Sequence, residues 1–347
     1  MAAQRSTLKE LAAELDISVA TASRALGGYE DISAKTRERV ALKAREMGYV
    51  ANSAGRMLVS GRSDFVGLVI PIHGPHLVDA FLGEFVTGMG EQLTQHGVDL
   101  FLATVSGDKS EMDVLRHVVE SGRADGVIIN RIADNDERIE FLKSRNFPFV
   151  AHGRLLEDDG SMSWLDTDGE AAFTEAFDRL YNLGHRRFGF LSVDEPMSFK
   201  HYRELGLDAA YEKANDPSLS MVKVSAPRSD EVALREACHN MLTADSRPTA
   251  VLAVIDELAV ILMQEAERLG IVIPDELSII GFDNSPEAAL TPPGLSTFDQ
   301  QIRSCARQMT DMLMMAIRDR KSPRQTKLIK PVFLGRGSHG PAPKDSI

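Results

Sequence analysis

A short stretch near the start of the chain, Ser18 to Leu26 (SVATASRAL), combines small side chains with a single charge. On a helix that begins at Ser18, Val19 and Ala20 lie in the first turn, and Arg24 follows on the same side. A guanidinium can donate two hydrogen bonds to guanine, and small apolar side chains can contact thymine methyl groups. The spacing alone leaves a second interpretation open, in which Val19 and Ala20 are packing residues and Arg24 is a solvated surface charge.

The residues around this stretch have the pattern of three short helices. Thr7 and Glu10 have capping-box spacing at the first helix, and Ser18 and Ser33 can cap the second and third. The expected inner faces are Leu8, Leu11, Ala12 and Leu15, then Val19, Ala22 and Leu26, then Val40, Ala44 and Met47. The connection DIS between the first two helices allows only a tight turn, which is the helix-turn-helix pattern.

Length and charge indicate a basic head on an acidic body. The chain has 347 residues, enough for more than one domain, and a formal net charge of -12. Residues 1–62 hold ten Lys and Arg against seven Asp and Glu, so the remainder carries -15. An acidic body disfavours indiscriminate nucleic-acid binding, whereas a basic head suits local contact with phosphate. The N-terminus lacks the apolar core of a secretory signal and no stretch is apolar enough to span a membrane, so a cytoplasmic protein is expected.

Neither a metal nor another cofactor is expected. Cys238 and Cys305 are far apart and form no CxxC pair, which argues against a disulfide framework and a thiolate zinc site. His73, His76 and Asp79 have regular spacing in one loop, but a histidine pair in a loop more often faces a ligand or solvent than a metal. The common catalytic motifs GxSxG, HExxH and GxxxxGK[ST] are absent, so an enzyme is disfavoured.

From residue 65 onward, apolar runs alternate with amphipathic stretches. The first series predicts strands at 65–71, 99–105, 124–130 and 147–153, with helices near 81–96, 110–121 and 135–145. The second predicts strands at 188–193, 221–226, 250–255 and 277–283, with helices near 169–184, 202–214, 229–243 and 256–269. This alternation predicts two lobes with parallel sheets, and a ligand site between them beyond the carboxyl ends of the strands.

Six blocks in order give the chain a specific resemblance over nearly its whole length. TLKELAAELDISVATASRAL, ISAKTRERV and MGYVANS lie in the head, and YNLGHRRFGFLS, IPDELSIIGFDNSPEAAL and PPGLSTFDQ lie in the body. The chain thereby resembles the lactose-repressor (LacI/GalR) family of transcriptional regulators. The resemblance implies an all-α helix-turn-helix head and an α/β core of two doubly wound parallel-sheet lobes, similar to periplasmic sugar-binding proteins.

The resemblance also implies a division of the chain and a mode of DNA binding. The expected parts are a DNA-binding domain at 1–50, a hinge helix at 51–61 and a core at 62–347. Within the core, the N-lobe is expected at about 62–163 and 294–323 and the C-lobe at about 164–293 and 324–343. A homodimer would bind a palindromic double-stranded operator, and the tail after residue 334 has no heptad pattern that would build a tetramer.

Each group of DNA-contacting residues carries over by position. Val19, Ala20 and Arg24 would face base edges. Leu58 would wedge into the minor groove at the centre of the operator. The positions that would contact the DNA backbone are Thr7, Ser18, Ser23, Ser33, Thr36, Tyr49 and Asn52.

Effector-binding residues carry over to the expected cleft. Arg203 and Asp283 suit a polyhydroxyl ligand, because a guanidinium and a carboxylate can grip adjacent hydroxyls. The other positions are Asn130, Arg154, Asp166, and the aromatic residues Phe81 and Phe199, on which a sugar ring could stack. Alternatively, Asp166 and Arg203 form a structural ion pair and Phe81 belongs to the core. Ile255 stands where the family commonly has Asn, which removes one polar contact.

The resulting expectation is a repressor of carbohydrate-utilisation genes whose operator affinity is switched by a sugar. A purine or phosphosugar effector in the same family is the alternative. A solute-binding protein without gene regulation is more distant, because the helix-turn-helix pattern and the absence of a signal peptide disfavour it. The sign of regulation stays open, since both inducers and corepressors occur in this family.

Overall fold

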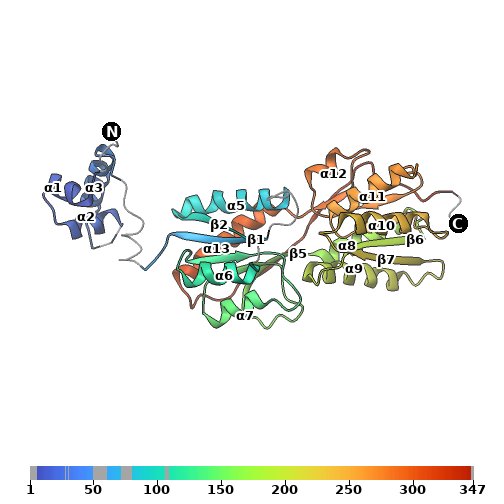
Figure 1. Cartoon of the computed structure of the whole chain (residues 1–347), viewed down its shortest axis with the longest axis horizontal. Helices are drawn as coiled ribbons and strands as arrows, with labels where there is room; N and C mark the ends of the chain where they lie inside the picture. Colours follow the sequence, from blue (N-terminus) through green and yellow to red (C-terminus); the bar gives the residue numbers. More distant parts are fainter. Residues whose placement is uncertain are drawn as a thin grey trace. The chain divides into compact units, whose positions relative to one another are not determined.

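The structure is a computed structural model that describes residues 6–27, 29, 31–49, 61–71, 80–105 and 109–344. Contacts divide the chain into two compact units, Met1–Asp64 and Phe65–Ile347, here called the head and the core. Figure 1 draws both units. Asn52 and Leu58, and with them the predicted hinge helix, lie outside the described residues, as does the loop with the two histidines.

The described part of the head contains three helices, α1 (Leu8–Glu14), α2 (Val19–Leu26) and α3 (Ala34–Glu46). Each begins at the expected capping residue: Thr7 forms a capping box at α1, and the Ser18 and Ser33 side chains accept backbone N–H bonds at α2 and α3. A small core joins the helices and consists of Leu11, Ala25, Ile32, Val40 and Ala44. The expected all-α head is confirmed.

The buried face of α2 differs from the predicted one. Ala22 and Ala25 are buried, whereas the Val19 side chain is 42% exposed. Val19 is the first residue of the helix, and the small core of the head centres on Ala25, one to two turns further along. The assignment of Val19 to the inner face was therefore wrong, and its side chain is available at the surface.

The first lobe of the core contains a six-stranded parallel sheet in the order β11-β5-β4-β3-β1-β2. Its strands are β1 (Phe65–Pro71), β2 (Asp99–Val105), β3 (Gly126–Ile129), β4 (Phe149–His152), β5 (Ser163–Thr167) and β11 (Thr326–Ile329). Four helices flank it, α5 (Ala80–His96), α6 (Glu111–Glu120), α7 (Glu137–Ser144) and α13 (Ile302–Arg318). Two separate apolar clusters lie on the sheet, one under α5 and α13 and the other under α6 and α7.

The second lobe contains a four-stranded parallel sheet in the order β7-β6-β8-β9. Its strands are β6 (Arg187–Val193), β7 (Ser220–Ala226), β8 (Ala250–Ala253) and β9 (Ser278–Ile280). Its helices are α8 (Gly169–Asn182), α9 (Ser198–Ala214), α10 (Glu231–Thr243), α11 (Asp256–Arg268) and the short α12 (Pro286–Leu290). Helix α8 packs against α9, and α10 packs against α11. The two parallel sheets confirm the expected α/β core.

The boundaries between the lobes differ from the expected ones. Strands β5 and β11 complete the first sheet, although the C-lobe was expected to begin at about 164 and again at about 324. Strand β10 (Thr297–Asp299) pairs with β12 (Val332–Leu334), and Ser296 bridges to Ile280 of β9, although the N-lobe was expected to resume at about 294. These pairings place the ends of the two sheets a few residues away from the expected lobe boundaries.

Candidate functional site

The exposed face of α2 presents the three predicted base-reading residues. Val19 and Ala20 are exposed in the first turn, and the Arg24 side chain is 52% exposed near the helix end. The Arg24 guanidinium forms an ion pair with Asp31, in the turn that follows, with an Nη1 to Oδ2 distance of 2.9 Å. Because Ala22 and Ala25 occupy the inner face of α2, the three predicted base-reading side chains project from the opposite side of the helix.

The hydroxyl residues predicted to contact the DNA backbone cluster at helix starts. Thr7, Ser18 and Ser33 are the N-caps of the three helices, and the Thr36 hydroxyl lies 2.8 Å from that of Ser33. Backbone N–H groups at a helix start favour an anion nearby. Ser23 and Tyr49 are half-buried, and Tyr49 packs against the small core of the head.

In the core, Arg203 of α9 is the centre of the predicted effector residues. It is 5% exposed, and its Nη1 donates to the carbonyl oxygen of Val254. Its guanidinium lies 3.8 Å from the ring centre of Phe282 and 4.7 Å from that of Phe199, so two aromatic faces hold it. Gly169 at the start of α8 makes room for it, because a Cβ there would lie 2.8 Å from the Arg203 side chain.

Asp283 is a partly buried carboxylate on the second lobe that interacts with Arg203. Burial raises the pKa of Asp283 to about 7, the neighbouring Asp256 adds to the rise, and the Arg203 charge opposes it. Gln300 donates a hydrogen bond to the same carboxylate. Asp283 also has a φ of 131°, a conformation that residues with side chains rarely adopt and that is common at functional sites.

Asp256, which was not predicted as a site residue, is fully buried at the start of α11 beside Asp283. Burial raises the pKa of Asp256 to about 6, although the Thr297 hydroxyl and the Ser285 N–H donate to it at 2.6 and 2.8 Å. The preceding Ile255 is also buried, so the apolar residue found there contributes packing rather than a polar contact.

The predicted residues Arg154 and Asp166 pair with each other. Arg154 Nε lies 3.3 Å from Asp166 Oδ2, and the Arg154 guanidinium lies 3.7 Å from the centre of the Tyr202 ring. Burial raises the pKa of Asp166, while Arg154 and Arg203 act against that rise. Asp166 therefore interacts electrostatically with Arg203, but its ion-pair partner is Arg154.

The predicted residue Phe81 packs against His152, which was not predicted as a site residue. The ring centres of Phe81 and His152 are 5.5 Å apart, and Phe85 packs on the same imidazole at 5.6 Å. His152 is 8% exposed, and its buried Nε2 has no hydrogen-bond partner within the described residues. Burial and the nearby Arg203 charge lower the pKa of His152 to about 4. The only available sequence signal was its position at the carboxyl end of the strand before Arg154.

The structure thus links Phe81, Arg154, Asp166, Phe199, Arg203 and Asp283 through direct contacts or charge interactions. Asn130 is buried at the end of β3, and the interaction that the structure gives it is a hydrogen bond from Arg138 to its backbone carbonyl. The link between His152 and Arg203 joins the first lobe to the second. One arginine, surrounded by carboxylates and aromatic rings, therefore lies where both lobes contribute side chains.

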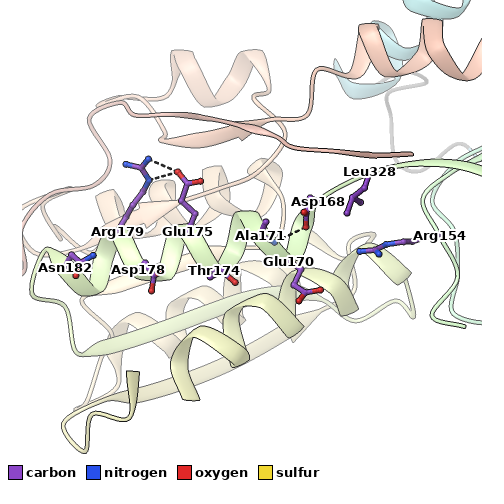
Figure 2. Close-up of a pocket in the computed structure, with 10 residues that line it drawn as sticks. All are labelled: Arg154, Asp168, Glu170, Ala171, Thr174, Glu175, Asp178, Arg179, Asn182 and Leu328. Atoms are coloured by element: carbon purple, nitrogen blue, oxygen red, sulfur yellow. Dashed lines mark hydrogen bonds and ion pairs between the residues drawn. The ribbon is translucent and has the colours of Figure 1, made fainter. Parts of the chain in front are cut away.

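A separate pocket runs along the exposed side of α8 (Figure 2). It has a volume of about 570 Å³ and includes Arg154 at one end, but the other predicted effector residues do not line it. Its lining includes four carboxylates and two arginines, and Arg179 pairs with Glu175 across one turn of the helix. The pocket is therefore not the predicted effector site.

The head and core together define a class of protein, a helix-turn-helix DNA-binding unit joined to a two-lobed ligand-binding core. Residues 7–52 match the family described as bacterial regulatory proteins, lacI family, and residues 177–339 match the periplasmic binding protein-like domain. The chain is 33% identical over 345 residues to the HTH-type transcriptional regulator AglR of Rhizobium meliloti (strain 1021). That alignment covers 98% of this chain and 96% of the relative.

Two solved structures share the fold over nearly the whole chain. The transcriptional regulator CelR in complex with cellobiose has a TM-score of 0.72 at 24% identity, covering 96% of this chain and 100% of that one. The lac repressor dimer bound to operator and the anti-inducer ONPF has a TM-score of 0.79 at 19% identity, covering 96% and 99%. The chain belongs to the LacI family of DNA-binding transcriptional regulators. Within the described residues, no helix is long and apolar enough to cross a bilayer.

Proposed function

We propose that this chain is a cytoplasmic repressor of carbohydrate-utilisation genes whose operator affinity is switched by a sugar bound between the lobes of the core. The observation that carries the proposal is the arrangement around Arg203, which lies between two aromatic rings and interacts with Asp166 and Asp283. A guanidinium and carboxylates can hold adjacent hydroxyl groups through charge-assisted hydrogen bonds. The CelR structure, which shares this fold, is a complex with a disaccharide.

The charge balance of the cluster favours an uncharged ligand. Arg154 is paired with Asp166, and Arg203 already interacts with Asp256 and Asp283, so each of these two arginines already has a carboxyl partner. A phosphosugar brings additional negative charge, which would need unpaired cations to bind it. A neutral sugar instead adds hydroxyl groups that can donate to the carboxylates and to the buried Nε2 of His152. Asn130, Phe81 and Phe199 are proposed to complete the site.

In the head, Val19, Ala20 and Arg24 are proposed to read base edges. Their exposure on one side of α2 supports this role. The proposed backbone contacts are Thr7, Ser18, Ser23, Ser33, Thr36, Tyr49 and Asn52. Leu58 is proposed as the minor-groove wedge within a hinge helix at 51–61.

A homodimer is the proposed functional unit, because two copies of a short recognition helix can together read a palindromic operator. The lac repressor dimer bound to operator, which shares this fold, is consistent with that assembly. The proposed chain division is a head at 1–50, a hinge at 51–61 and a core from residue 62. Ligand binding would alter the arrangement of the lobes and thereby bias the hinges, which is a coupling between two sites.

The proposal is tested by selecting DNA sites from a random library with the full-length protein and titrating the best complex with a ligand panel. We expect a palindrome to be enriched, and Arg24→Ala to weaken operator binding by about 1–3 kcal/mol and relax preference at one base pair. Neutral sugars are expected to change operator affinity, while sugar phosphates and purines are not. A response to purines or phosphosugars alone would replace the proposed ligand class, and failure to enrich any palindrome would refute the proposed mode of DNA reading.

A further inference from the structure

Arg24 of the head forms an ion pair with Asp31, which base reading alone does not require. The Arg24 guanidinium lies 2.9 Å from Asp31, and both side chains are 52% exposed. An exposed ion pair of this kind contributes little to stability. The carboxylate lies beside the one charged residue on the exposed face of α2, where it repels any phosphate that approaches the same guanidinium.

The turn that carries Asp31 is fixed to both neighbouring helices. The Tyr29 N–H donates to the Arg24 carbonyl at 3.2 Å, and the Tyr29 carbonyl accepts from Ile32 at 3.2 Å and from the Arg37 side chain at 2.9 Å. Ile32, next to Asp31, is buried in the small core of the head. The backbone on either side of Asp31 is therefore held at a defined place relative to α2.

The geometry of the pair leaves the arginine able to bind a base. Asp31 contacts Nη1, and a guanidinium carries further N–H donors on Nη2 and Nε in a rigid planar fork. The Asp31 contact to Nη1 restricts how the plane of that fork can turn on the Arg24 side chain. Bidentate recognition of guanine depends on this plane, whereas contact with a phosphate does not.

We propose that Asp31 is a specificity-determining residue, which holds the Arg24 guanidinium in its base-reading orientation and keeps it from serving as a phosphate anchor. This inference rests on the proposed role of Arg24 in reading a base. Asp31 acts through Arg24, so it is a positioning residue rather than a base contact. Its effect falls on discrimination between DNA sequences more than on operator affinity.

The test compares Asp31→Asn with Glu14→Gln in the full-length protein. Glu14 also pairs with a cation of the head, Lys43 at 3.3 Å, so both variants lose one carboxylate charge and one ion pair, and Lys43 keeps Glu46 at 3.7 Å. The measured quantity is the discrimination ratio, which is the dissociation constant for the operator with the Arg24-dependent base pair exchanged divided by the dissociation constant for the selected operator. We expect Asp31→Asn to lower this ratio roughly three- to tenfold, mainly through tighter binding to the exchanged site, since a bidentate contact supplies the discrimination.

Glu14→Gln is expected to tighten binding to both sites equally and to leave the ratio unchanged, and Asp31→Glu to recover most of the discrimination. Equal shifts for Asp31→Asn and Glu14→Gln, or a higher ratio for Asp31→Asn, would overturn the inference. Arg24→Ala distinguishes a failure of the inference about Asp31 from a failure of the proposed base reading. If Arg24→Ala keeps the ratio, the proposed base reading fails and the inference with it; if Arg24→Ala loses the ratio and Asp31→Asn does not, only the inference fails. Melting curves verify that each variant is folded.

Discussion

Replacing Asp283 by asparagine should make the core more stable at high pH and should also abolish the response to sugar. Burial raises the pKa of Asp283 to about 7, far above its usual value of 3.8. Between its usual pKa of 3.8 and the raised pKa of about 7, the folded protein therefore holds a proton on Asp283 that the unfolded chain has already released. Stability is present in full below the unfolded pKa and falls as the pH rises towards 7, because ionising the buried carboxyl costs free energy. Asparagine has the same shape and never ionises.

The size of the effect follows from the pKa change. Between about pH 5 and pH 8 the free energy of unfolding of the wild type should fall by up to about 3 kcal/mol relative to that of the variant. Each pH unit between 5 and 7 contributes about 1.4 kcal/mol to this fall. Asp283 is partly exposed to solvent and interacts with Asp256, so about half of this ceiling is the realistic value. At roughly 2–4 °C per kcal/mol for a unit of this size, the melting midpoints should diverge by about 3–6 °C over that range.

The assay is thermal unfolding of the full-length wild type and Asp283→Asn at several pH values, followed by circular dichroism. Asp245→Asn, which removes an exposed carboxylate from the same lobe, is the control for a general charge effect. We expect the melting midpoint of Asp283→Asn to change less with pH than that of the wild type. The melting midpoint of Asp245→Asn is expected to change with pH in parallel with the wild type. Parallel profiles for wild type and Asp283→Asn would refute the argument that this carboxyl is ionised against a desolvation cost.

Two further predictions concern packing and the buried histidine. Gly206→Ala should destabilise the core by about 3 kcal/mol, because a Cβ on Gly206 would lie 2.0 Å from the Glu170 carbonyl oxygen where α8 packs on α9. Gly90→Ala is the control within a helix and should not destabilise the core, because the space around its Cβ is open. Equal melting points for the two variants would contradict the close approach at Gly206. The pKa of His152 falls to about 4 on folding, so the free energy of unfolding of the wild type should decrease by up to about 3 kcal/mol between about pH 6.5 and 4. His152→Leu should reduce this decrease. The exposed His201→Leu is the comparison, and an unchanged acid profile in His152→Leu would show that the buried imidazole does not carry the effect.

Local sequence patterns predicted most of the elements but few of the contacts within the site. The capping residues of the head and the alternating strands and helices have local signals, and the structure contains them. Strand β5 (SWLDT) is short and mixed, and it is a strand because β4 and β11 pair with it on either side. Helix α13 had a usable signal, since its buried residues recur at helical spacing, but it follows the end of the regular alternation and was not predicted.

The cluster around Arg203 could be predicted only in part, because its members are brought together by the fold. Arg203 and Asp283 were expected from the family resemblance, whereas His152 and Asp256 come from other elements and have no motif of their own. A buried histidine beside Phe81 is indistinguishable in sequence from a core residue. Its missing hydrogen-bond partner emerges only when the neighbouring strands and helices are in place.

The same cluster suggests why a ligand could bias the two lobes. Asp283 and Asp256 bear the cost of burial, and His152 Nε2 lacks a partner within the described residues. Hydroxyl groups that satisfy these atoms would recover part of that cost only when the first lobe, which carries His152, and the second, which carries the aspartates, both contact the ligand. Binding energy is then available specifically for one arrangement of the lobes, which is what a switch requires. Linkage makes the coupling reciprocal: whatever factor the sugar imposes on operator affinity, operator DNA imposes on sugar affinity.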